Sequence, residues 1–172
     1  VQIGIAGVSL FALANATGRI IWGMIFDRIS SATAVQVNLL SQALVLLTAP
    51  LMLSSVYGFW LFSLLTGFNY GGVLVIYVAS ASRYWGSERV SQIYGYLFSS
   101  NIPASMSPIL AGLVFDRFHS FTLALCGLAG LLVLFTALVR RNAQLFNEDI
   151  APPLSNSRRR ETNPQLSPTV QG

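Results

Sequence analysis

The sequence predicts an all-α protein, a polytopic bundle of membrane-spanning helices. Hydrophobic residues make up 53% of the 172 residues and charged residues only 9%, whereas soluble domains contain about 25% charged residues. The mean hydropathy is +0.62. Five apolar segments each reach the roughly 20 residues that a helix needs to cross a bilayer. The segments are too long for barrel strands and do not alternate apolar with polar residues, which excludes a closed β-barrel.

The five predicted spans are separated by short polar joints. They cover residues 3–26, 33–53, 57–82, 92–115 and 121–139. The first ends at Asp27-Arg28, the second at Ser54-Ser55, the third at the joint 83–90, the fourth at the joint 116–120 and the fifth before Arg140-Arg141. Joints this short make neighbouring helices antiparallel. We therefore expect a transmembrane bundle over residues 1–141.

Residues 142–172 have a different composition. They contain four prolines and few large apolar side chains, so they cannot bury enough surface to offset the entropy lost on ordering. We expect this segment to be a disordered tail.

The arginines predict the orientation of the bundle. If residue 1 starts outside, Arg28, Arg83, Arg89, Arg140 and Arg141 lie on the inner side and Arg117 alone lies on the outer side. The positive-inside rule favours this orientation, which makes the C-terminus cytoplasmic. Interfacial aromatic anchors then fit the borders: Trp22 and Trp85 near the inner face, Tyr57 and Trp60 near the outer face.

Several other classes of protein are disfavoured. The basic residues form no stripe on one folded face, so we expect no nucleic-acid partner. The single cysteine, Cys126, excludes an intrachain disulfide framework and thiol metal sites. All six acidic residues lie at span edges or in the tail, and no metalloprotease, nucleophile-elbow or phosphate-loop motif occurs. We therefore expect no enzyme, no cofactor and no metal.

Arg19 is the exceptional residue of the first span. It precedes Asp27 by eight residues, or about 12 Å of helix, which places it near the middle of a hydrocarbon core about 30 Å thick. An arginine at that depth is costly and faces a bundle interior or a wet cavity. It either bonds carbonyls of a neighbouring helix or receives an anionic solute, which its planar, permanently charged group suits. Asn15, one turn earlier, could orient it.

Other polar residues fall near the middle of the third and fourth spans. The candidates for substrate contact are Asn69, Tyr70, Ser99 and Asn101. Each alone is more typical of a helix–helix contact, but as a set at one depth they gain weight. Small residues four apart also indicate close helix packing; the pairs are Gly67 with Gly71, Ala104 with Pro108 and Pro108 with Gly112.

The end of the first span has a recognisable pattern. Gly23, Asp27 and Arg28 form G-x-x-x-D-R, which resembles the motif between the second and third helices of major facilitator superfamily transporters, repeated between the eighth and ninth. The resemblance implies that these three residues help to close a cytoplasmic gate. Ser30-Ser31 follow where the family has glycine and further basic residues, which implies a weaker latch.

Two further stretches support this resemblance. Residues 111–121, AGLVFDRFHSF, look like the family's junction between the eleventh and twelfth helices. Residues 68–100, with the pair Tyr94-Gly95, resemble the tenth and eleventh helices of the oxalate:formate antiporter and monocarboxylate transporter-like branches. The five spans would then be the eighth to twelfth helices of an incomplete C-terminal half, and the N-terminal half would be missing.

The resemblance also implies a role for Arg19. These branches have an arginine in the eighth helix that pairs with a substrate carboxylate, and the oxalate type uses a second basic residue in the eleventh helix, which residues 91–114 lack. We therefore expect a fragment of a secondary transporter that moves a small organic anion, a monocarboxylate, by alternating access. Its partners would be that anion, the lipid bilayer and the missing half. A non-transporting membrane sensor, a partner-binding subunit and an inactive truncated product remain the alternatives.

Overall fold

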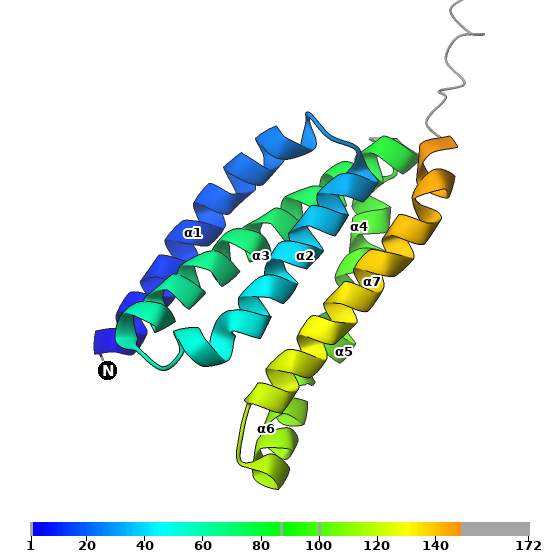
Figure 1. Cartoon of the computed structure of the whole chain (residues 1–172). Helices are drawn as coiled ribbons and strands as arrows, with labels where there is room; N and C mark the ends of the chain where they lie inside the picture. The colour runs from blue at the N-terminus through cyan, green and yellow to red at the C-terminus, as the bar shows by residue number, and fades with distance from the viewer. Residues whose placement is uncertain (1, 87, 100, 149–172) are drawn as a thin grey trace, which may run out of the picture.

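The computed structural model describes residues 2–86, 88–99 and 101–148, without the side chains of residues 101 and 144–148. Every regular element in these residues is a helix (Figure 1). The helices are α1 (Gln2–Phe26), α2 (Ser31–Met52), α3 (Val56–Trp85), α4 (Val90–Ser99), α5 (Asn101–Ala104), α6 (Ser107–Phe118) and α7 (Thr122–Glu148). The predicted all-α class is confirmed.

Five segments are long and apolar enough to cross a membrane, as the sequence predicts. α1, α2, α3 and α7 each form one such segment, and the fourth, Val90–Phe118, is divided among α4, α5 and α6. Pro103 falls in the short α5 and Pro108 in the first turn of α6. Proline has no N–H to donate and is tolerated at the start of a helix rather than in its interior, so Pro108 accounts for the restart of the helix at Ser107, after the turn at residues 105 and 106.

The α7 helix is longer than the predicted fifth span. It continues to Glu148, so the first residues of the predicted tail are helical. The rest of the predicted tail, residues 149–172, lies outside the described residues.

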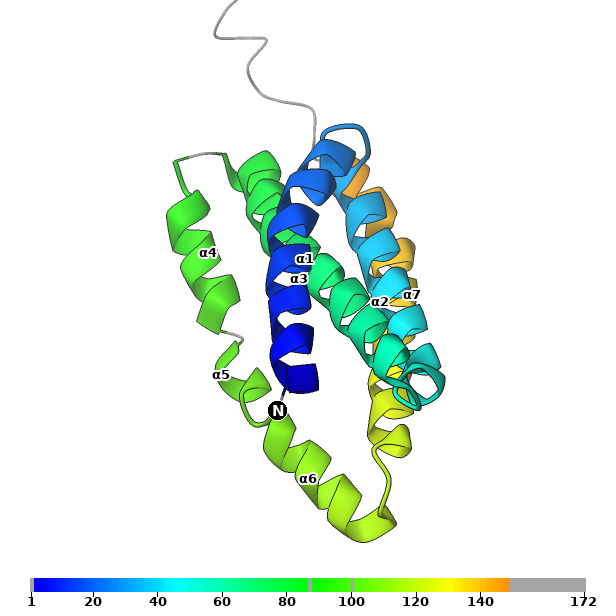
Figure 2. The same cartoon turned by 90° about the vertical axis from the view of Figure 1, so that its left-hand side faces the viewer.

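The five membrane-length segments alternate in direction, and α1 and α2 both pack against α3 (Figure 1). α3 lies between α1 and α2, and α7 packs against the other side of α2 (Figure 1). The chain of α4, α5 and α6 runs apart from these helices, meeting α3 near its upper end and α7 near its lower end (Figure 2). The C-terminal ends of α1, α3 and α7 share one end of the molecule, as antiparallel joints require (Figure 1).

Glycines bring α1 and α3 into backbone contact. A Cβ at Gly67 would clash with the backbone of Phe11, and one at Gly18 would clash with the backbone of Phe68. A Cβ at Gly71 would clash with the Asn15 carbonyl oxygen. Small residues at such positions let helix backbones approach closely. The predicted packing role of Gly67 and Gly71 is confirmed.

The other predicted small-residue pairs are not packed in this way. Ala104 and Pro108 are exposed, and a Cβ added at Gly112 would meet no atom within 4 Å. The prediction of close packing at these residues is wrong for the described part of the chain, because no described helix covers that side of α5 and α6.

Trp22 lies in the core rather than at a membrane border. It is 3% exposed and clusters with Phe26, Ala34 and Ile76. Its indole occupies the space beside Gly72, where a Cβ would lie 2.5 Å from the ring. The prediction of an interfacial anchor is therefore wrong for Trp22, because Gly72 on α3 has no side chain and leaves room for the ring.

Candidate functional site

Arg19 lies beside the glycine contacts between α1 and α3, and its side chain is exposed. Its Nε donates a hydrogen bond of 3.4 Å to Oδ1 of Asn15, one turn earlier. Asn15 is half-buried and its backbone lies against Gly71. Residues four apart on a helix are neighbours, so the sequence prediction that Asn15 orients Arg19 agrees with this contact. The tight α1–α3 packing fixes the backbone from which the guanidinium extends.

Arg19 opens onto a groove between α1, α3 and α4. The groove has a volume of about 900 Å³, and its lining includes Arg19, Tyr70, Tyr94 and Phe98. Arg19 is the single basic residue among the described residues that line it. An arginine in apolar surroundings can receive a carboxylate through two parallel hydrogen bonds. The groove therefore has the charge and the space to hold an organic anion.

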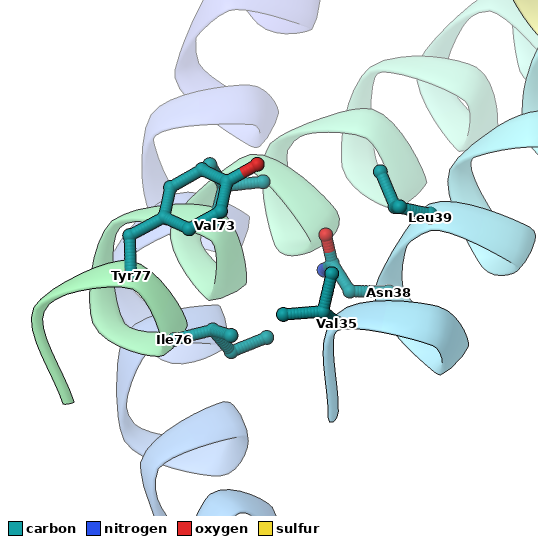
Figure 3. A pocket seen from close by; sticks show the side chains of 6 residues that line it. All are labelled: Val35, Asn38, Leu39, Val73, Ile76 and Tyr77. Atoms are coloured by element: carbon teal, nitrogen blue, oxygen red, sulfur yellow. The ribbon is translucent and has the colours of Figure 1, made fainter. Parts of the chain in front are cut away.

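A second cavity, between α2 and α3, is too small for a solute. It is lined by Val35, Asn38, Leu39, Val73, Ile76 and Tyr77 (Figure 3). Its volume of about 10 Å³ is at the lower limit for a single water molecule. We therefore identify the groove beside Arg19 as the candidate site.

The structure separates Asn69 from Tyr70, although the two residues are adjacent in sequence. Tyr70 is half exposed and lines the groove. Asn69 is 5% exposed and faces α2, where its Oδ1 accepts a hydrogen bond of 2.9 Å from Ser41 and its carbonyl accepts one of 3.1 Å from Asn38. In this arrangement Asn69 joins two helices and does not reach the groove.

Of the two candidates from the fourth span, Ser99 does not line the groove. Ser99 is exposed near the end of α4, and its hydroxyl donates to the Gly95 carbonyl oxygen at 2.9 Å. Asn101 begins α5, but its side chain lies outside the described part. The structure therefore brings together Arg19, Asn15 and Tyr70, and does not bring Asn69 or Ser99 to them.

The predicted gating residues form the end of α1. A Cβ built on Gly23 would lie 3.8 Å from the side chain of Val75 on α3, which is an ordinary contact distance. The backbone N–H of Asp27 donates a hydrogen bond of 3.1 Å to the Gly23 carbonyl oxygen and so closes the last turn of α1. The side chains of Asp27 and Arg28 are exposed beside this end, where they are free to meet a neighbouring helix end.

Arg83 is a residue that sequence reasoning used only to orient the bundle. From the last turn of α3 it donates hydrogen bonds to the carbonyl oxygens of Phe26, at 2.8 Å, and Ile29, at 3.0 Å. Its guanidinium carbon lies 3.9 Å from the centre of the Phe26 ring. The last carbonyls of a helix are unpaired and carry partial negative charge, so Arg83 caps α1 from another helix. The sequence signal that could have indicated this role is a basic residue in the last turn of α3.

A metal centre finds no support in the described part of the molecule. The described residues contain no group of three or more His, Cys, Asp or Glu side chains that could hold a metal ion. The described lining of the groove offers a single permanent cation and aromatic hydroxyls, which suit the binding of an anion.

The comparisons with known proteins identify the family. A family model of the Major Facilitator Superfamily matches residues 1–168. No curated protein and no solved structure matches the chain. Since the family match spans nearly the whole chain, the protein belongs to the major facilitator superfamily, a family of multi-pass membrane transporters that in general are not enzymes.

Proposed function

We propose that this chain is part of a secondary carrier that moves a small organic anion, a monocarboxylate, across a membrane. The observation behind the proposal is the position of Arg19. It lies within an apolar helix, is oriented by Asn15 at 3.4 Å, and opens onto the groove of about 900 Å³. A charge at that depth is usually retained for function. A single cation among the described lining residues suits one carboxylate better than two.

The motifs favour the C-terminal half of such a carrier. The G-x-x-x-D-R pattern of Gly23, Asp27 and Arg28, and the joint 111–121, resemble the family's second-half motifs. We propose that the five spans correspond to the eighth to twelfth helices and belong to the oxalate:formate or monocarboxylate-like branch. A missing N-terminal half would then provide the other wall of the path, because carriers of this kind bind substrate between repeats.

We place the gate at the end of the molecule shared by α1 and α3. Asp27 and Arg28 are exposed there, and Arg83 of α3 holds the last carbonyl of α1 and one carbonyl of the joint that follows it. Since five of the arginines that flank the spans fall at this end, the positive-inside rule favours a cytoplasmic position for it and for the C-terminus. Alternating access would open and close this end during transport.

The test is uptake by the complete carrier reconstituted in liposomes. We expect Arg19→Met to abolish the saturable uptake of radiolabelled propionate and 3-phenylpropionate, and Arg19→Lys to retain a part of it, because lysine keeps the charge but loses the planar fork. Arg117→Met is the matched control. Arg117 lies on α6, outside the groove and on the less basic side, so its loss should change neither uptake nor orientation.

Two results would contradict the proposal. Uptake that Arg19→Met leaves unchanged would remove the binding role of this residue. Anion binding without any flux in the unaltered carrier would favour a solute sensor instead.

A further inference from the structure

Three aromatic residues line the groove together with Arg19, beside aliphatic residues and two serines. α3 provides Tyr70, which is 50% exposed, and α4 provides Tyr94 and Phe98, of which Phe98 is 55% exposed. The rings of Tyr94 and Phe98 lie 5.9 Å apart, centre to centre, at a tilt of 41°. Aromatic rings pair favourably at centre distances of about 4.5–7 Å in tilted or offset arrangements, so these faces can receive a further ring.

A narrow recess branches from the groove between α3 and α4. Its volume is about 80 Å³, and it shares Tyr70, Leu74, Tyr94 and Phe98 with the groove. Tyr77 adds a third tyrosine to its lining. Because the shared residues form a common border, a molecule whose charged end meets Arg19 has an aromatic pocket within the same site.

The described lining of the groove offers no negative charge to balance a positive one. Among the described residues that line it, none is Asp or Glu. A carboxylate that pairs with Arg19 leaves the ammonium group of an amino acid without a counter-charge, and a buried charge that is not paired is costly. The groove therefore disfavours amino acids, which bear an ammonium group beside the carboxylate.

We propose that the site selects a monocarboxylate with an aromatic body and no amino group. The carboxylate pairs with Arg19, and the ring enters the recess against Tyr70, Tyr94 and Phe98. This inference rests on the proposed function, since it specifies the substrate class of the same site. It adds that the ring provides a large share of the affinity, because burial of a phenyl-sized group strengthens binding by roughly tenfold or more.

The experiment compares four probes that differ by one group each. The purified complete carrier is titrated with 3-phenylpropionate, propionate, 3-phenylpropan-1-ol and phenylalanine, and binding is measured by thermal stabilisation. We expect 3-phenylpropionate to bind more tightly than each of the others by roughly tenfold or more, because they lack the ring, lack the carboxylate or add an ammonium group.

Matched variants separate the ring from the charge. Phe98→Ala should lower the affinity for 3-phenylpropionate by roughly tenfold and leave the affinity for propionate unchanged, because only the probe with a ring loses a contact. Phe135→Ala is the control. Phe135 on α7 is 54% exposed, nearly the same as Phe98, and does not line the groove, so its loss should alter neither affinity.

The outcomes distinguish the two proposals. Equal affinity for propionate and 3-phenylpropionate, both lost with Arg19→Met, would overturn the aromatic selectivity and leave the anion carrier in place. Tight binding of phenylalanine would likewise overturn the exclusion of an ammonium group. Affinity for 3-phenylpropionate that Arg19→Met does not change would overturn the carrier proposal itself.

Discussion

Gly71→Ala should force α1 and α3 apart at the level of the candidate site. The added Cβ would lie 3.1 Å from the Arg19 amide nitrogen and closer still to the Asn15 carbonyl oxygen. The helices would have to separate by about 1 Å to restore ordinary contact. Because the obstructing atoms belong to backbone, no side-chain rotation can relieve the clash. Overpacking of this kind costs about 1–3 kcal/mol.

The assay is thermal unfolding of the complete carrier in detergent, followed by the loss of monodisperse protein. Gly71→Ala should lower the midpoint by several degrees. Gly127→Ala is the control, because a Cβ at Gly127, in the second turn of α7, meets no atom within 4 Å. Its midpoint should stay the same or rise slightly with the better helix propensity of alanine. Equal midpoints for the two variants would refute the close packing of α1 on α3.

Two further substitutions test contacts between helices. Arg83→Met removes two hydrogen bonds at the end of α1 and the stacking on Phe26. We expect the free energy of unfolding to fall by about 1–3 kcal/mol and a cysteine introduced by Asp27→Cys to be labelled faster. Unchanged labelling would contradict the capping of α1 by Arg83. Ser41→Ala leaves the buried Asn69 Oδ1 without its donor, which should cost about 1 kcal/mol in the same unfolding assay, whereas Ser9→Ala, whose hydroxyl bonds only its own helix, should cost less.

Most of the fold could be predicted because membrane-spanning length is a local property. The apolar runs give four of the five segments within a few residues of their observed ends. The restart of the helix at Ser107, within the fourth segment, could not be located from the sequence, since where a helix restarts depends on its neighbours. The position of Trp22 could not be predicted, because a tryptophan near a helix end suits both a membrane border and a core. Gly72, on a different helix, decides between them.

The candidate site was predictable where its contacts lie within one helix. The pair Asn15 and Arg19 follows from a spacing of four residues. Asn69 and Tyr70 look equivalent in sequence, yet a rotation of about 100° per residue sends one to α2 and the other to the groove. The cap formed by Arg83 joins helices distant in sequence, so only their packing brings donor and acceptors together.

The two walls of the groove belong to parts of the molecule that are joined very differently. α1 and α3 are locked by backbone contacts at their glycines and by Arg83 at one end, so Arg19 and Tyr70 have a fixed relation to each other. α4 has far fewer contacts with α3 and none of its residues is buried, so Tyr94 and Phe98 are on the less constrained wall. A ligand shifts a conformational equilibrium only through its different affinity for the two states. An aromatic anion that bridges both walls would bind the closed groove more tightly than the open one, and the same contacts that select the solute would then close the site around it.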